Sequence, residues 1–170
     1  MLLSASRLLA QGVSEPTLKA AFLYNFVKFA EWPAEVWAPN MPLTLCVLGD
    51  EAVQSELERS VKGHTVGERS LNVIPVSIDG ALRSCHLLYV TGLDRRRLAQ
   101  VIAQVKEAPV FTVSDSDAFA ALGGISQLFV ENGKMKFAIN PASALRARLR
   151  ISSKLLALAK LVKDEPETDR

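Results

Sequence analysis

Four continuous apolar runs, separated by polar or helix-like segments, constrain the fold of this chain more than any other feature. The runs span residues 43–48, 71–76, 87–90 and 110–113. Unbroken apolar runs of this length are typical of parallel strands that are buried on both faces of a sheet. The segments at 52–61, 94–105 and 117–122 are predicted to be the intervening helices. We therefore predict a single three-layer, doubly wound α/β domain of the Rossmann-like type with a mainly parallel sheet.

The second half of the chain departs from this pattern at Asn132-Gly133. This dipeptide is a preferred two-residue turn of a β-hairpin. It joins the segments at 125–131 and 134–139, both of which have strand-like composition. We therefore expect an antiparallel hairpin that extends one edge of the sheet.

Short elements follow the hairpin. Pro141 is expected to begin a short helix that ends near residue 147, before an extended link at 149–151. Ser152 or Ser153 then caps a final helix that is expected to continue to about residue 162.

An aromatic segment before the first strand predicts a helix that packs on the core. Ser14 is a suitable N-cap, and Pro33 ends the helix because it disfavours helical backbone in the preceding residue. At the helical period one face is apolar, whereas Lys19 falls outside it. The predicted buried face consists of Leu18, Phe22, Asn25, Phe26 and Phe29.

Length and composition indicate one folded domain. The 170 residues are 49% hydrophobic and 22% charged, which suits a single core. We assign 14–162 to the domain and 163–170 to a mobile tail. No apolar run reaches the roughly 20 residues of a membrane-spanning helix. The net charge is only +2, so we expect no nucleic-acid partner.

Catalytic and metal-binding motifs are absent from the sequence, and we expect neither an enzyme nor a bound cofactor or metal. His86 directly follows Cys85, but neighbouring side chains on an extended segment point to opposite faces. His64 is expected to be a solvated loop residue. Cys46 and Cys85 lie in or beside strands that are predicted to be neighbours, so the residues alone leave a disulfide and two buried thiols equally open.

A ligand site is expected where the parallel strands end. In doubly wound sheets, ligands bind outside the carboxyl ends of the strands, near the switch in strand order. The alternative is that these small and polar residues only form turns and helix caps. The candidate ligand-binding residues are Gly49, Asp50, Thr91, Gly92, Ser114 and Asp115.

Two groups of side chains are candidates for partner binding. Trp32, Val36 and Trp37 follow the first helix and are expected to offer an apolar surface for a partner or a second copy of the chain. A basic group near the end of the domain is suited to an acidic partner or an anionic lipid surface, although a solvated helix face is the ordinary interpretation. It consists of Arg146, Arg148, Arg150 and Lys154.

The sequence resembles the YfiR-type family of exported bacterial regulators. The resemblance is clearest in the aromatic segment at 19–33, in the run at 151–162 and in Gly123-Gly124 before a strand. It implies a disulfide between Cys46 and Cys85, because family members carry a cysteine pair at matching places. A second pair found in some relatives is absent from 120–127.

The resemblance also implies a location and a role. A periplasmic protein of this kind restrains an inner-membrane diguanylate cyclase by binding its external sensor domain, which lowers cyclic di-GMP and biofilm formation. We expect residues 1–13 to be the remnant of a signal peptide or a disordered terminus, and we expect a homodimer. Reduction of the disulfide is a hypothetical route to redox control. The alternative function is an extracytoplasmic sensor domain for a nucleotide or an amino-acid-like small molecule.

Overall fold

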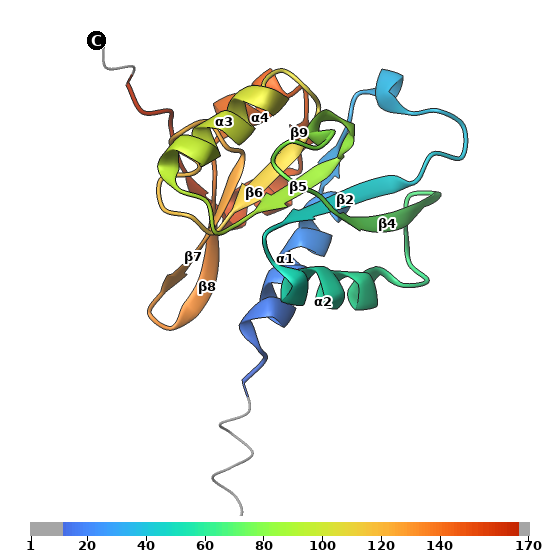
Figure 1. Ribbon diagram of the computed structural model, residues 1–170, viewed down its shortest axis with the longest axis horizontal. Helices are drawn as coiled ribbons and strands as arrows, with labels where there is room; N and C mark the ends of the chain where they lie inside the picture. Colours follow the sequence, from blue (N-terminus) through green and yellow to red (C-terminus); the bar gives the residue numbers. More distant parts are fainter. Residues whose placement is uncertain (1–11, 167–170) are drawn as a thin grey trace, which may run out of the picture.

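Eight strands form the central sheet of this computed structural model, which describes residues 12–166 (Figure 1). The strands are β2 (Leu43–Leu48), β3 (Thr65–Val66), β4 (Arg69–Pro75), β5 (Leu87–Val90), β6 (Phe111–Ser114), β7 (Ser126–Glu131), β8 (Lys134–Ile139) and β10 (Lys160–Leu161). Their order is β10-β8-β7-β6-β5-β2-β4-β3. Only the pairs β7–β8 and β3–β4 are antiparallel, and the other neighbours are parallel. The predicted fold class is therefore confirmed.

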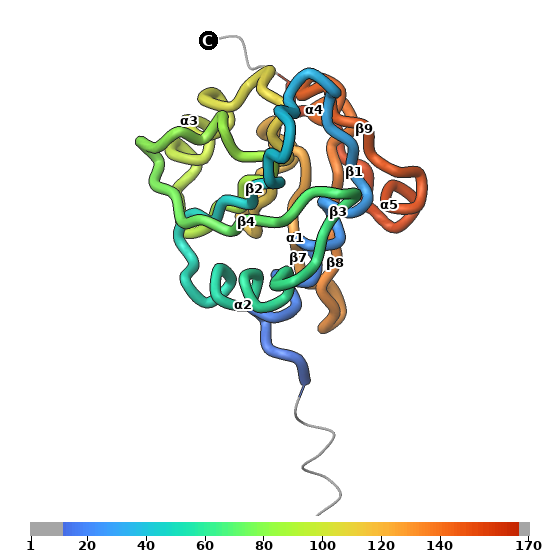
Figure 2. The backbone as a smooth tube through the Cα atoms, turned by 90° about the vertical axis from the view of Figure 1, so that its right-hand side faces the viewer, coloured from blue at the N-terminus to red at the C-terminus, as the bar shows by residue number. Residues whose placement is uncertain are grey.

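Helices cover both faces of the sheet. α1 (Glu15–Lys28) and α2 (Glu51–Val61) pack against one face, whereas α3 (Arg95–Val105) lies against the other. Figure 2 shows α2 and α3 on opposite sides of β2 and β4. Two separate groups of buried side chains fill the layers, one on each face of the sheet.

Smaller elements complete the fold. A second, two-stranded sheet pairs β1 (Ala30–Glu31) with β9 (Arg150–Ile151) in antiparallel orientation. Two 3₁₀ turns, η1 (Ala34–Val36) and η2 (Leu82–Ser84), precede β2 and β5. The remaining helices are α4 (Pro141–Arg146) and α5 (Ser153–Leu158).

The predicted hairpin is confirmed, but it does not form the edge of the sheet. Asn132 and Gly133 have φ angles of 53° and 73°, the left-handed pair that a two-residue hairpin turn requires. Beyond this hairpin, β10 pairs in parallel with β8 and becomes the edge strand. The final helix was predicted to reach residue 162, but α5 ends at Leu158, and the chain becomes extended to form this strand.

The first helix begins where predicted, but its predicted face is buried only in part. Phe26 is buried and Leu18 and Phe22 are half-buried, whereas Asn25 is exposed. Ser14 caps it by accepting a hydrogen bond from the amide of Thr17, and the helix ends at Lys28, well before Pro33. Phe29, predicted to be buried, is 38% exposed because it is the C-cap residue with non-helical backbone. The buried helical residues are Lys19, Ala20, Leu23, Phe26 and Val27.

The helix predicted at 117–122 is a series of turns. Ala118 has a φ of 64°, which interrupts a right-handed helix. The turns still place Phe119 in the core beside α3, where it is completely buried.

Candidate functional site

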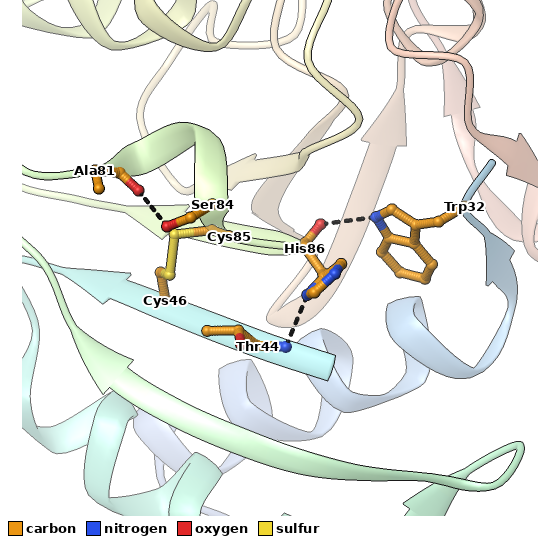
Figure 3. The surroundings of a disulfide bond; sticks show 7 residues. All are labelled: Trp32, Thr44, Cys46, Ala81, Ser84, Cys85 and His86. Carbon is orange, nitrogen blue, oxygen red and sulfur yellow. Dashed lines mark hydrogen bonds between the residues drawn. A yellow bond between two sulfur atoms is a disulfide. The ribbon is translucent and has the colours of Figure 1, made fainter. Parts of the chain in front are cut away.

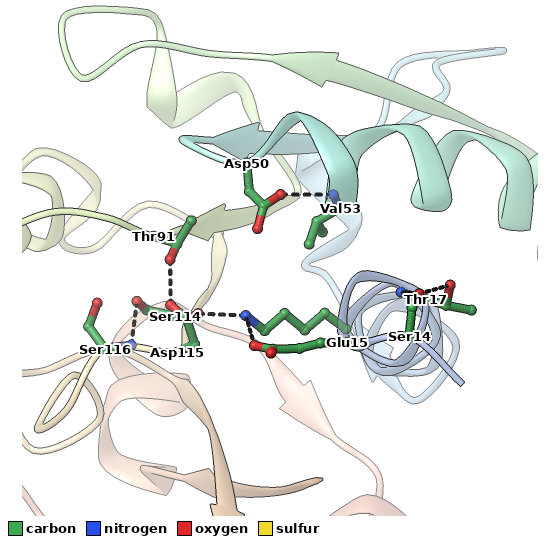
Figure 4. Close-up of polar contacts among 10 residues, drawn as sticks. Ser14, Glu15, Thr17, Asp50, Val53, Thr91, Ser114, Asp115 and Ser116 are labelled. Carbon is green, nitrogen blue, oxygen red and sulfur yellow. Dashed lines mark hydrogen bonds and ion pairs between the residues drawn. The ribbon is translucent and has the colours of Figure 1, made fainter. Parts of the chain in front are cut away.

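A buried ion pair occupies the strand ends where a ligand was predicted (Figure 4). Asp115 directly follows β6, and its Oδ2 lies 2.7 Å from the Nζ of Lys19 on α1. Its Oδ1 accepts a hydrogen bond of 2.6 Å from the hydroxyl of Thr91, which follows β5. Glu15 adds a second carboxylate 2.8 Å from Lys19. The lysine side chain is only 8% exposed, so this cluster joins α1 to the ends of two parallel strands.

The electrostatics of this cluster favour the charged forms of both partners. Burial alone would lower the pKa of Lys19, but its hydrogen bonds to Asp115 and Glu15 outweigh burial and raise that pKa. Burial alone would raise the pKa of Asp115, but its hydrogen bonds from Lys19 and Thr91 lower it. Tyr89 lies nearby with a raised pKa, caused by burial and the charge of Asp115. Within residues 12–166, its buried hydroxyl has no hydrogen-bond partner.

Other predicted ligand-binding residues serve the local structure. Asp50 caps α2 by accepting a hydrogen bond of 3.0 Å from the amide of Val53. Ser114 is fully buried, and its hydroxyl accepts a bond from the amide of Ser116. Gly49 has a φ of +92°, and a Cβ there would lie 2.5 Å from the carbonyl oxygen of Thr91. Gly92 also has a positive φ, of 73°. A ligand at these six positions remains a prediction.

Lys19 is the member of this cluster that the sequence pattern missed. It fell outside the buried face that the helical period defined through Phe22, Phe26 and Phe29. The sequence spacing does indicate that Lys19 is buried, because it lies four residues before Leu23 and seven before Phe26. Those spacings put all three on one helical face.

A disulfide joins Cys46 in β2 to Cys85, which follows η2 and lies just before β5 (Figure 3). Their Cα atoms are 5.9 Å apart, and 39 positions separate them in sequence. Both residues are buried, at 0% and 2% exposure. The bond that the resemblance implied is therefore present between neighbouring parallel strands.

His86 connects the disulfide region to an aromatic cluster. Its Nδ1 accepts a hydrogen bond of 2.9 Å from the amide of Thr44, and its carbonyl accepts one from Nε1 of Trp32. The ring of Trp37 stacks on the imidazole with centroids 4.5 Å apart, and the guanidinium of Arg69 lies 4.0 Å from the Trp37 ring. Burial and the charge of Arg69 lower the pKa of His86 to about 4. The imidazole is therefore neutral near pH 7.

The predicted apolar partner surface divides into buried and accessible parts. Trp32 is 9% exposed and belongs to the core, so it offers little area for direct contact. Val36 and Trp37 are partly buried against that core and keep some exposed area. Figure 3 shows Trp32 beside His86, as expected for a residue that packs against the strands.

The predicted basic group does not form one free positive face. Arg146 makes an ion pair with Asp164, and Arg148 pairs with Glu35. Arg150 is exposed on β9, and Lys154 is exposed on α5. Only part of the group is therefore free for an external anion.

Residues 12–166 contain no cluster of three or more His, Cys, Asp or Glu side chains arranged to hold a metal ion. Within the same part of the chain, none of the helices has both the length and the hydrophobicity needed to cross a bilayer. The signal-peptide remnant predicted at residues 1–13 lies almost wholly outside the described residues.

The fold and the disulfide define a doubly wound α/β domain whose central strands are covalently joined. The chain belongs to the YfiR/HmsC-like family, whose model matches residues 16–160. No curated protein sequence matches the chain.

Two solved structures share the fold. A conserved domain protein from Vibrio cholerae is similar at a TM-score of 0.57 and 11% identity, over 89% of this chain and 61% of that one. The ABC domain from Streptococcus pneumoniae in complex with L-Trp is similar at a TM-score of 0.55 and 12% identity, over 84% and 60%. This chain therefore spans about three fifths of the length of each structure.

Proposed function

We propose that this protein binds the external sensor domain of a membrane diguanylate cyclase and restrains the enzyme without catalysing a reaction itself. Lower cyclic di-GMP and reduced biofilm formation would be the cellular result. The observation that best supports this proposal is the family match, which spans residues 16–160.

Restraint of this kind requires differential affinity. A regulator shifts the cyclase population only if it binds the inactive conformation of the sensor domain more tightly than the active one. A rigid regulator suits this task, because little of its binding free energy is then spent on ordering its own surface. The disulfide between β2 and β5 contributes such rigidity.

We place the partner surface at η1, around Val36 and Trp37. The Trp37 ring is already fixed between His86 and Arg69, which reduces the side-chain entropy lost on binding. His86 also follows Cys85, so reduction of the disulfide would loosen the backbone that supports this ring. This connection supplies a physical route for redox control. A second copy of the chain is the competing occupant of the surface.

The test is a pull-down from the periplasm of cells that contain the external domain of the organism's own cyclase. The proposal predicts capture by the wild-type protein and weaker capture by Trp37→Ala. The control is Leu145→Ala, which removes a 78% exposed leucine on α4. Cyclic di-GMP should rise with Trp37→Ala and not with the control. Equal capture by both variants would contradict the assigned surface, and no capture by the wild type would contradict the proposed partner.

A second candidate function is an extracytoplasmic sensor of a small molecule. A cavity of about 570 Å³ beside α3 favours this function. Ligand binding should raise the melting temperature with concentration. A metabolite screen by thermal denaturation therefore distinguishes a ligand sensor from a protein that binds only another protein.

A further inference from the structure

A cavity of about 570 Å³ lies between α3, the turns at 121–123 and α4. Figure 1 shows α3 and α4 close together at this end of the sheet. Much of its lining is apolar and comes from Ile102, Val110, Ile125 and Ala147. Arg146 lies at the same cavity and brings a permanent positive charge to it. Lys106 adds a second basic group to the lining, and Glu107 and Glu165 add carboxylates. An apolar floor with a few charged groups is typical of a site for a small amphipathic ligand.

Three N–H donors, two from Arg146 and one from Asn140, converge on the carboxylate of Asp164, which lines this cavity. Arg146 donates from NH1 to Oδ2 of Asp164 at 2.8 Å and from NH2 to Oδ1 at 3.1 Å. Asn140 donates from Nδ2 to the same Oδ1 at 2.7 Å. Two guanidinium donors that meet both oxygens of one carboxylate form the bidentate geometry that arginine provides. The chain's own Asp164 therefore occupies a carboxylate-binding site.

The donors keep other supporting contacts besides Asp164. Asn140 is completely buried, donates to the carbonyl of Ala120 at 2.8 Å and accepts a bond from the amide of Ser143. Arg146 also donates to the hydroxyl of Ser143 at 2.9 Å. These bonds hold the two side chains in position without help from the segment that carries Asp164. The site is thus preorganised for an anion.

The ion pair that holds the occupying carboxylate is accessible to solvent. Asp164 and Arg146 are 41% and 40% exposed, and ion pairs with such exposure contribute little to stability. Its neighbour Glu165 attaches the segment to the domain through an ion pair with Arg95 and a backbone bond to Ala121. On the other side, the amide of Val162 bonds to the carbonyl of Ile139. The chain on either side would therefore stay attached if Asp164 left the site.

We propose that Arg146 and Asn140 bind the carboxylate of a small molecule whose apolar part fills this cavity, and that Asp164 is an internal competitor for the same donors. One negative charge replaces another, so the local charge is unchanged on exchange. The inference goes beyond the regulatory role and does not require the cyclase partner.

Calorimetric titration with phenylacetate tests this site, with phenylacetamide as the uncharged control. Asp164→Ala removes the competitor and should tighten phenylacetate binding about two- to fivefold, the scale of an exposed ion pair. Arg146→Gln should weaken binding about tenfold or more, because it removes the charge-assisted bonds. Glu131→Ala, which removes a carboxylate from the β7–β8 hairpin, should behave like the wild type.

Three results would overturn the proposal. One is equal phenylacetate affinity in the wild type and in Asp164→Ala. Another is binding of phenylacetamide as tight as that of phenylacetate, which would leave no role for the carboxylate. The third is no binding of either phenylacetate or hexanoate to Asp164→Ala at millimolar concentration. Circular dichroism of each variant checks that the fold is intact.

Discussion

Lys19 and Asp115, which are 96 positions apart in sequence, form an ion pair of 2.7 Å that joins the first helix to the carboxyl end of β6. The lysine is nearly inaccessible and the aspartate side chain is 26% exposed. Removal of only one partner of such a pair is costly, because the other charge is then buried without a partner. The contact therefore fixes α1 against the sheet.

Removal of either partner should destabilise the protein. We expect Asp115→Asn and Lys19→Met each to lower the free energy of unfolding by about 3 kcal/mol, the lower end for a buried pair. Urea denaturation measures the change. Glu15→Gln is the control, since Glu15 is 66% exposed, and it should cost roughly 0.5 kcal/mol or less. The double variant Lys19→Met/Asp115→Asn should cost less than the sum of the single changes, and simple additivity would show that the pair is not coupled.

This pair also shows where sequence reasoning succeeds and fails. The strands β2, β5 and β6 were predictable because burial on both faces leaves an unbroken apolar run. Lys19 was not predicted to be buried because the buried face was assigned through the aromatic residues at the helical period, and the partner of Lys19 lies on a different element. The positions of Thr91 and Asp115 at the strand ends were predictable, but their mutual hydrogen bond depends on tertiary structure.

The end of the chain was harder to predict. β10 consists of two residues, Lys160 and Leu161, and becomes a strand only because β8 offers it an open edge. No sequence period is visible in so short an element. Asp164 lies in a charged segment that was predicted to be a mobile tail, yet it contacts Arg146 and Asn140. Specific contacts of this kind depend on two distant parts of the chain and leave no local pattern.

His86 should make the stability depend on pH. Its pKa is about 4 in the folded protein against 6.5 as the ordinary value, so the unfolded chain binds a proton first as the pH falls. The neutral imidazole makes its full contribution to the free energy of unfolding above pH 6.5. This contribution, about 3 kcal/mol in total, is lost as the pH falls from 6.5 to 4. Urea denaturation across this range should show the loss.

Asparagine is the informative replacement, because its side-chain oxygen can accept the bond from Thr44 without gaining a proton. His86→Asn should therefore flatten the pH dependence between pH 6.5 and 4. The exposed His64 supplies the control, and His64→Asn should keep the wild-type slope. An unchanged slope in His86→Asn would mean that other groups cause the dependence.

The disulfide between Cys46 and Cys85 should contribute about 4 kcal/mol to stability, the chain-entropy estimate for a loop of roughly 40 residues. Reduction with dithiothreitol should lower the urea midpoint of the wild type. The variant Cys46→Ala/Cys85→Ala should unfold at a similar low midpoint and show no response to dithiothreitol. If reduction leaves the wild-type midpoint unchanged, the bond contributes no net stability.

Gly49 lies at the end of β2, where the strand order reverses between β2 and β5. Its φ is +92°, and an added Cβ would lie 2.5 Å from the carbonyl oxygen of Thr91. That oxygen belongs to the backbone beside the Lys19–Asp115 pair, so it cannot move without disturbing the pair. Gly49→Ala should therefore destabilise the protein through both backbone strain and a steric clash.

Gly63→Ala separates these two causes. Gly63 has a φ of +74°, but an added Cβ there meets no atom within 4 Å. We expect Gly63→Ala to cost about 1 kcal/mol from left-handed backbone alone, and Gly49→Ala to cost more than about 2 kcal/mol because the clash adds to it. Thermal and urea denaturation of both variants supply the comparison. Equal costs would show that the contact with Thr91 relaxes easily, and the strand ends would then be less rigid than the ion pair implies.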